Sequence, residues 1–133
     1  MSRVLALDHG RARCGVAVSD PSGTLATPLA AVERPDSGHG LDALAALVRE
    51  WEPGCVVVGL PLPLSGGESA QTAAARAFAK ALQRRLGGGV PVELEDERFT
   101  TRLAQRDPAQ SRGDEDSRAA AHLLEGWLAR RPR

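Results

Sequence analysis

The sequence has no long hydrophobic run, and this absence sets the first limit on what the protein can be. No stretch of its 133 residues approaches the roughly 18 consecutive apolar residues that a membrane-spanning helix needs. At the N-terminus, Arg3 precedes only the apolar run 4–7, which is too short for the core of a signal peptide. We therefore expect a cytoplasmic protein with no membrane partner.

Cysteine is scarce as well. Cys14 and Cys55 form no C-x-x-C pair and lie in apolar runs typical of strands, which favours reduced, buried thiols over a disulfide or a zinc site. No cluster of histidine and cysteine competes for a metal ion elsewhere in the sequence. A bound metal should therefore be one that prefers oxygen ligands.

The chain also lacks an excess of charge of either sign. Its 17 basic residues balance 17 acidic ones, so no overall positive field favours loose binding of nucleic acid. Lys80 is the only lysine, and the other basic residues are arginines, which bind phosphate in bidentate fashion. A GC-rich coding bias explains the same composition, so the positions of the arginines matter more than their number.

The length predicts one domain, 1–133, with a buried core. Apolar periodicity and turn residues predict strands at 3–8, 14–19, 24–32, 55–60 and 90–95, and helices at 41–51, about 69–86 and about 114–129. The continuous apolar run 55–60 is typical of a central strand, whereas Pro28 favours an edge position for the third strand. The order βββαβαβα predicts an α/β fold with a mixed five-stranded sheet and helices on both faces.

Acidic residues stand at the ends of three of these elements. Asp8 follows the first strand, Asp96 and Glu97 follow the fifth, and Asp116 lies near the start of the last helix. Asp116 begins an apolar stripe that continues through Ala119, Ala120, Leu123, Leu124, Trp127 and Leu128. An aspartate there is commonly an N-cap, but a buried carboxylate must otherwise be paired, hydrogen-bonded or metal-bound. Because ligands gather at the carboxyl ends of parallel strands, the three acidic positions predict one site.

Four sequence blocks, in order, resemble the YqgF/RuvX family of ribonuclease H-like nucleases. Residues 8–20 read DHGRARCGVAVSD, which is similar to the family's D-x-G-x-x-R-x-G-v-A-v-s-D. VGLPL at 58–62, DERFTT at 96–101 and DSRAA at 116–120 resemble its V-G-L-P-L, D-E-R-x-T-T and D-x-x-A-A segments. The D-x-G turn also opens actin-like and sugar-kinase ATPases, but those enzymes close two lobes over a nucleotide and this chain supplies one.

The resemblance implies a ribonuclease H-like fold in which Asp8, Glu97 and Asp116 are catalytic and bind a divalent metal, Mg²⁺ or Mn²⁺. Two such ions about 3.5–4 Å apart can activate a water and stabilise the leaving oxygen of a phosphodiester. Strict alternation along 90–97 instead places Asp96 on the apolar side of the strand and favours it as the inward acid. We follow the family and expect Glu97, with Asp96 as the alternative.

Nucleic-acid contacts are expected at Arg13, Arg98 and Thr100, which match family positions. Each arginine could bind a phosphate or neutralise the acids beside it, and Thr100 could simply start a helix. Residues 111–116 read SRGDED where the family is rich in lysine, which should weaken phosphate attraction, and Arg112 and Arg118 are expected to compensate in part. The loop 63–68 is stiffer and less polar than the family's loop.

The implied function is metal-dependent hydrolysis of structured nucleic acid, either RNA or branched DNA. The resemblance favours processing of the pre-16S ribosomal RNA end. The alternatives are a Holliday junction resolvase and a non-catalytic nucleic-acid-binding maturation factor. The presence of all three acids favours an enzyme, and a resolvase would need a homodimer to cut two strands in concert.

Overall fold

The computed structural model describes residues 2–97 and 112–131, and the side chains of 112–115 lie outside the described part. In chain order the elements are β1 (Val4–His9), β2 (Arg13–Ser19), β3 (Ala26–Glu33), α1 (Gly38–Trp51), β4 (Cys55–Leu60), α2 (Ala70–Leu86), β5 (Val92–Asp96) and α3 (Arg112–Arg130). This order confirms the predicted βββαβαβα succession. Among the described helices, none is long and apolar enough to cross a membrane.

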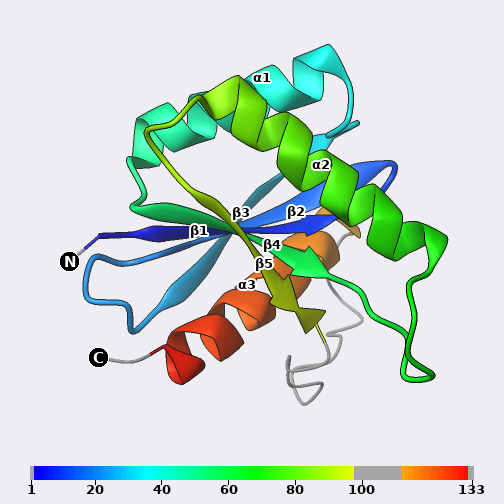
Figure 1. The fold of residues 1–133 in the computed structure, drawn as a ribbon. Coiled ribbons are helices and arrows are strands. Elements are labelled where there is room, and N and C mark those ends of the chain that lie inside the picture. Colours follow the sequence, from blue (N-terminus) through cyan, green and yellow to red (C-terminus); the bar gives the residue numbers. More distant parts are fainter. Residues whose placement is uncertain (1, 98–111, 132–133) are drawn as a thin grey trace.

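The strands form one mixed sheet of five in the order β3-β2-β1-β4-β5 (Figure 1). The tight turn between β1 and β2, in which Gly10 N donates to Arg13 O at 2.9 Å, makes these strands antiparallel. β1, β4 and β5 run parallel, so their carboxyl ends meet on one side of the sheet. Pro28 lies in an edge strand, as predicted, and β4 is buried along its whole length.

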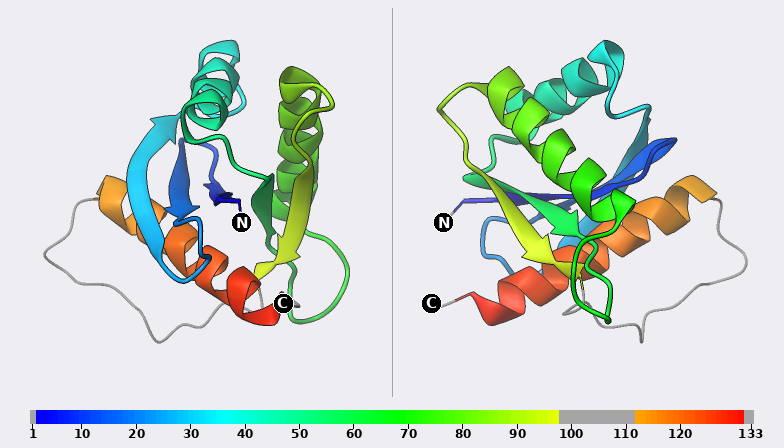
Figure 2. Two further views of the ribbon diagram at one scale, coloured as in Figure 1. Left: turned by 90° about the vertical axis from the view of Figure 1, so that its left-hand side faces the viewer. Right: turned by 45° about the vertical axis from the view of Figure 1, so that its right-hand side comes forward.

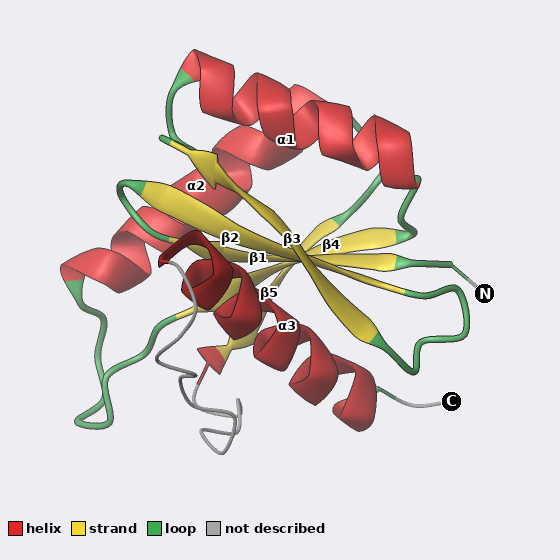
Figure 3. Ribbon diagram, turned by 180° about the vertical axis from the view of Figure 1, so that it is seen from behind, coloured by secondary structure: helices red, strands yellow, loops and turns green. Residues whose placement is uncertain are grey.

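Helices α1 and α2 cover one face of the sheet and α3 covers the other (Figures 2 and 3). Successive strand side chains alternate between these two faces. Leu5 and Leu7 of β1 pack in the core beneath α1 and α2, whereas Val4 and Ala6 pack in the core beneath α3. Asp8 therefore follows Ala6 on the α3 face. Cys14 and Cys55 are free and buried, as the sequence predicts.

His9 points to the opposite face from Asp8. Its ring stacks on Phe78 of α2 with centroids 4.6 Å apart, and its Nε2 lies 2.8 Å from Asp36 Oδ2. These contacts tie the end of β1 to the α2 layer and hold the strand in the register that places Asp8 beneath α3.

The α3 helix approaches β2 closely because Gly15 has no side chain. A Cβ at Gly15 would stand 1.9 Å from the carbonyl oxygen of Asp116. Beside this contact Val16 N donates to the buried hydroxyl of Ser117 at 3.3 Å, a docking contact that the sequence reading missed. A small polar residue close to the alanine run 119–121 was the available signal.

The buried stripe of α3 differs from the predicted one. Its fully buried members are Ser117, Ala120, Ala121, Leu123 and Leu124, whereas Ala119 is exposed. Because the helix begins at Arg112, Asp116 lies in its second turn and is not an N-cap. The carboxylate of Asp116 therefore sits at the edge of the buried stripe, where it can reach the end of the sheet.

Helix α1 begins at Gly38 rather than at the predicted residue 41. Ser37 is its N-cap, and the Ser37 hydroxyl accepts a hydrogen bond from Gly40 N at 3.0 Å. Gly40 also packs against the preceding turn, where a Cβ would come within 2.0 Å of Arg34 O. Close packing therefore requires a glycine at position 40.

Replacing Gly15 by alanine should destabilise the fold, since either α3 or β2 must move to admit the methyl group. We expect Gly15→Ala to lower the free energy of unfolding by about 1–3 kcal/mol. Gly38→Ala is the matched control, because a Cβ at Gly38 meets nothing within 4 Å. Urea denaturation measures both variants, and equal stability of the two would show that α3 does not rest on Gly15.

Candidate active site

Asp8 and Glu97 form a carboxyl pair at the carboxyl ends of β1 and β5, joined by a side-chain hydrogen bond. The intervening strand contributes Gly59, which pairs with Glu95 of β5. A Cβ at Gly59 would stand 2.6 Å from Glu97 Oε2. Glu97 therefore reaches back across β4 towards Asp8 only because position 59 has no side chain.

The two acids hold their protons unusually strongly. Burial, followed by the charges of Glu97 and Asp116, raises the pKa of the Asp8 carboxyl from its ordinary 3.8 to about 7. Burial also raises the pKa of Glu97, and the hydrogen bond from Asp8 opposes that rise. The Asp8 carboxyl is thus the protonated one, and it donates a hydrogen bond to the Glu97 carboxylate.

Asp116 lies in the same neighbourhood, but it is paired with Arg13. Arg13 Nε donates to Asp116 Oδ2 at 2.9 Å, and the two side chains are 36% and 37% exposed. The charge of Asp116 still contributes to the raised pKa of Asp8. Across residues 2–97 and 112–131, however, no three acidic, histidine or cysteine side chains already stand together as a metal-ligand group.

The choice between Asp96 and Glu97 depends on which face of β5 meets α3. Glu95 forms an ion pair with Arg130 of α3, so Glu95 and Glu97 lie on the α3 side of the strand, the side of Asp8. The alternation rule, which grouped Glu97 with Glu95, agrees with this geometry. Glu97 rather than Asp96 lies beside Asp8, and its role as the metal ligand stays a prediction. Asp96 acts on the pair through space, since its charge raises the pKa of Glu97.

Of the basic residues expected at the site, the structure describes the side chains of Arg13 and Arg118. Arg118 is half-buried, and its Nη1 is buried without a hydrogen-bond partner among the described residues. Arg13 forms an ion pair with Asp116. Arg98 and Thr100 lie outside the described residues, as does the side chain of Arg112.

The donor set fits a hard divalent cation. Asp8 and Glu97 are half-buried, and within the described part of the chain neither forms an ion pair with an arginine or lysine. Two adjacent carboxylates that lose their shared proton repel each other, and an oxygen-seeking cation relieves that repulsion. Asp116 could add a third ligand if its pairing with Arg13 were loosened.

The fold and this carboxyl pair place the protein among ribonuclease H-like α/β proteins with an acidic site. The RuvC of T. thermophilus in complex with a Holliday junction substrate superimposes with a TM-score of 0.57 at 16% identity, covering 97% of this chain and 96% of that one. A Thermus thermophilus RuvC structure gives a TM-score of 0.56 at 17% identity, covering 96% and 95%. These likenesses establish the fold.

The family follows from sequence. The model of the family described as "RuvX: Holliday junction resolvase" matches residues 2–130, and the chain belongs to this family. A relative from Anaeromyxobacter sp. (strain Fw109-5), named "Putative pre-16S rRNA nuclease", is 46% identical over 133 residues, covering 95% of this chain and 96% of its own. A relative of the same name from Rhodococcus erythropolis (strain PR4 / NBRC 100887) is 43% identical over 143 residues, covering 98% and 80%.

The raised pKa of Asp8 makes stability depend on pH. Between 3.8 and about 7 the folded state binds a proton at Asp8 that the unfolded state has lost, so this group's contribution to stability falls as the pH rises through that window. Asp8→Asn removes the titration, so the stability of this variant relative to wild type should increase from pH 4 to pH 7. Urea denaturation across this range measures the difference.

The control for this experiment is Glu50→Gln, which removes an exposed carboxyl from α1. Its stability relative to wild type should stay constant over the same range. If Asp8→Asn behaves in the same way as the control, the carboxyl of Asp8 is not held as described.

Proposed function

We propose that this protein is a metal-dependent nuclease that hydrolyses phosphodiester bonds of structured nucleic acid, and that residues 1–133 act as one domain. The observation that carries the proposal is the half-buried Asp8–Glu97 pair at the meeting point of three parallel strands. Asp116, whose charge acts on Asp8, and its partner Arg13 add a further acid and a guanidinium beside this pair.

The substrate we propose is the end of precursor 16S ribosomal RNA. Relatives with this substrate in their names align over 95% and 98% of the chain, which includes every acid of the candidate site. Processing of such a precursor would take place in the cytoplasm. Resolution of Holliday junctions is the second candidate, favoured by the family's description, and it would require a homodimer because two strands are cut in concert.

In this mechanism Asp8, Glu97 and Asp116 would hold Mg²⁺ or Mn²⁺. When bound, such a metal polarises the phosphate and lowers the pKa of the attacking water. The chain must first release the proton shared by Asp8 and Glu97, because a protonated carboxyl is a poor ligand. The pKa of about 7 at Asp8 allows this release near neutral pH.

Arg13 has two roles in this proposal. Without metal, its guanidinium neutralises Asp116 and limits the repulsion among the three acids. With Asp116 holding the cation, the planar guanidinium of Arg13 would be free to bind a phosphate in bidentate fashion. We include Arg118 among the proposed nucleic-acid contacts, because its buried Nη1 has no hydrogen-bond partner among the described residues. Arg98, Thr100 and Arg112 remain proposed contacts with the flanking nucleic acid.

Cleavage assays test both the residues and the substrate. With Mg²⁺ or Mn²⁺, the wild type should cut a precursor 16S rRNA end, and Asp8→Asn or Glu97→Gln should each slow cleavage by about 100-fold or more, since metal contributes several kcal/mol to such a transition state. Asp96→Asn is the matched control and should retain most of the activity. The reverse pattern would make Asp96 the ligand.

The same assay should include a four-way DNA junction and an unstructured RNA of equal length. Cleavage of the junction in preference to the ribosomal end would support the second candidate. Failure of the wild-type protein to cut any of these substrates with either metal would refute the nuclease proposal.

Metal binding can be detected without cleavage. Mg²⁺ or Mn²⁺ at about tenfold excess over its dissociation constant should raise the melting temperature by about 5 °C, because the cation binds the folded state preferentially. The increase should disappear in Asp8→Asn and grow in Arg13→Ala, which frees Asp116. Potassium chloride at matched ionic strength is the control, and an equal rise with potassium would argue against a specific site.

A further inference from the structure

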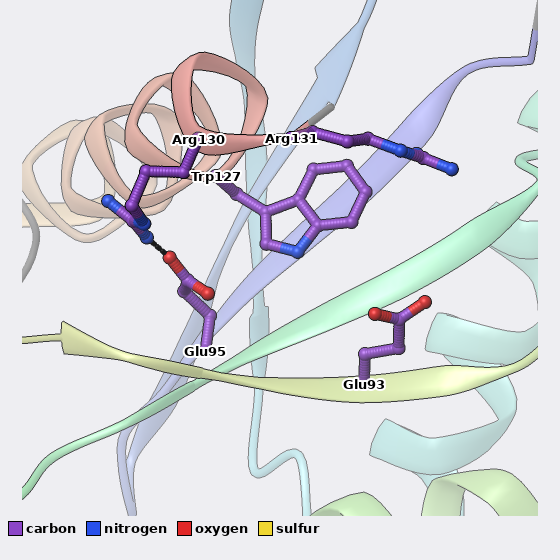
Figure 4. Close-up of a pocket in the computed structure, with 5 residues that line it drawn as sticks. All are labelled: Glu93, Glu95, Trp127, Arg130 and Arg131. Carbon is purple, nitrogen blue, oxygen red and sulfur yellow. Dashed lines mark ion pairs between the residues drawn. The ribbon is translucent and has the colours of Figure 1, made fainter. Parts of the chain in front are cut away.

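A groove runs along the α3 face of the sheet, between β5 and the C-terminal end of α3 (Figure 4). It consists of two adjoining cavities of about 330 Å³ and about 700 Å³, and Glu93 and Arg131 line both of them. The smaller cavity also contacts Glu95, Trp127 and Arg130, and the larger one extends to Arg3. The groove is separate from the Asp8–Glu97 pair and has no role in the reaction described above.

An arginine stacked on a tryptophan is the distinctive feature of this groove. The guanidinium of Arg131 lies 4.6 Å from the centre of the Trp127 ring. Stacking and a hydrogen bond with the Cys55 side chain hold this guanidinium in place, and its other N–H groups face the groove. Among the described residues, Arg131 forms no ion pair with a carboxylate. Arg3 instead stacks on Trp51 of α1, 5.4 Å from the ring centre, and so directs its guanidinium towards the α1 side of the sheet.

The charges of the groove are arranged asymmetrically. Glu95 is neutralised by its ion pair with Arg130, so Glu93 is the carboxylate that faces the groove from β5 (Figure 4). The stacked Arg131 lies on the other side, at the end of α3. A ligand with phosphates along one edge and amino-bearing bases along the other matches this arrangement, since Glu93 accepts hydrogen bonds and repels phosphate.

The position of the groove links it to the acid pair. Glu93 and Glu95 lie on the α3 face of β5, about 7 Å apart, and Glu97 directly follows the strand. Glu95 pairs with Gly59 of β4, and β4 pairs in turn with β1. The end of the groove at Glu95 is therefore about two strand spacings, or roughly 10 Å, from Asp8. A nucleic-acid strand that leaves the acid pair along β5 would enter the groove directly.

We propose that this groove binds an unpaired segment of the nucleic acid that flanks the scissile bond. Arg131 contacts its phosphates, the Arg131–Trp127 stack supports a base, and Glu93 accepts from a base amino group. Single strands are commonly bound by such a combination of positive charge and aromatic stacking. The cavity volumes suit a few nucleotides rather than a duplex. This inference rests on the proposed nuclease function for the identity of the ligand.

Binding of a fluorescent unpaired hexanucleotide, measured by anisotropy without metal, tests the groove independently of cleavage. Arg131→Ala should weaken binding about tenfold, the size of one lost stacking contact, and should reduce the salt dependence by about one phosphate contact. Arg49→Ala, which removes an exposed arginine from α1 on the opposite face, should bind as the wild type does. Equal affinities of the two variants would overturn the proposal.

Cleavage of matched substrates supplies the second measurement. One substrate carries six unpaired nucleotides on the 5′ side of the cleavage site, one carries them on the 3′ side, and one carries neither. Wild-type protein should show a lower KM for one flanked substrate, and Arg131→Ala should lose that advantage while cutting the unflanked substrate normally. Equal loss on all three substrates would mean a structural role for Arg131. Cleavage of the unflanked substrate reports on the nuclease function alone.

Base identity gives a final check. Oligonucleotides of cytosine or adenine, which present amino groups, should bind the wild type more tightly than oligonucleotides of uracil, and Glu93→Gln should reduce this discrimination. Unchanged discrimination in Glu93→Gln would remove Glu93 from the proposed contact.

Discussion

The close contact between α3 and β2 at Gly15 is the constraint on which the candidate site depends. It brings the carbonyl of Asp116 to a position that a Cβ on the strand would occupy, and the buried hydrogen bond from Val16 N to Ser117 holds the helix there. Asp116 thereby comes near enough for its charge to act on Asp8, although the two residues are far apart in sequence. Any side chain at position 15 would push the last acid away from the other two.

A second glycine, Gly59 of β4, allows Glu97 to approach Asp8 from the other side. Gly59 lies between β1 and β5, and the space above it is filled by the carboxyl group of Glu97. The two glycines thus allow acids from three elements to converge in a buried place that penalises their charge. The raised pKa of Asp8 and the ion pair between Arg13 and Asp116 are two ways in which the protein tolerates this concentration of carboxyl groups. A divalent cation would be a third.

The face of the sheet beneath α3 carries both the acid pair and the groove lined by Arg131 and Trp127. β5 is an edge strand whose residues are half-buried or exposed, so its α3 side is partly open. The central strands β1 and β4 are instead packed in hydrophobic cores on both faces. In the proposed function, a nucleic-acid substrate would meet the molecule on this face, with chemistry at the carboxyl ends of the strands and binding groups along β5.

The sequence by itself determined the order of elements, the edge position of the strand that contains Pro28 and the acids at the element ends. These features depend on local periodicity and on residue types, which are visible along the chain. It did not reveal which face of β5 lies beside Asp8, because alternation defines two faces without saying which one meets α3. The exposure of Ala119, the docking role of Ser117 and the pairing of Arg13 with Asp116 were likewise hidden. Only the tertiary structure decided these points, since each depends on how α3 packs on the sheet, where it contacts a strand about 100 residues earlier in the chain.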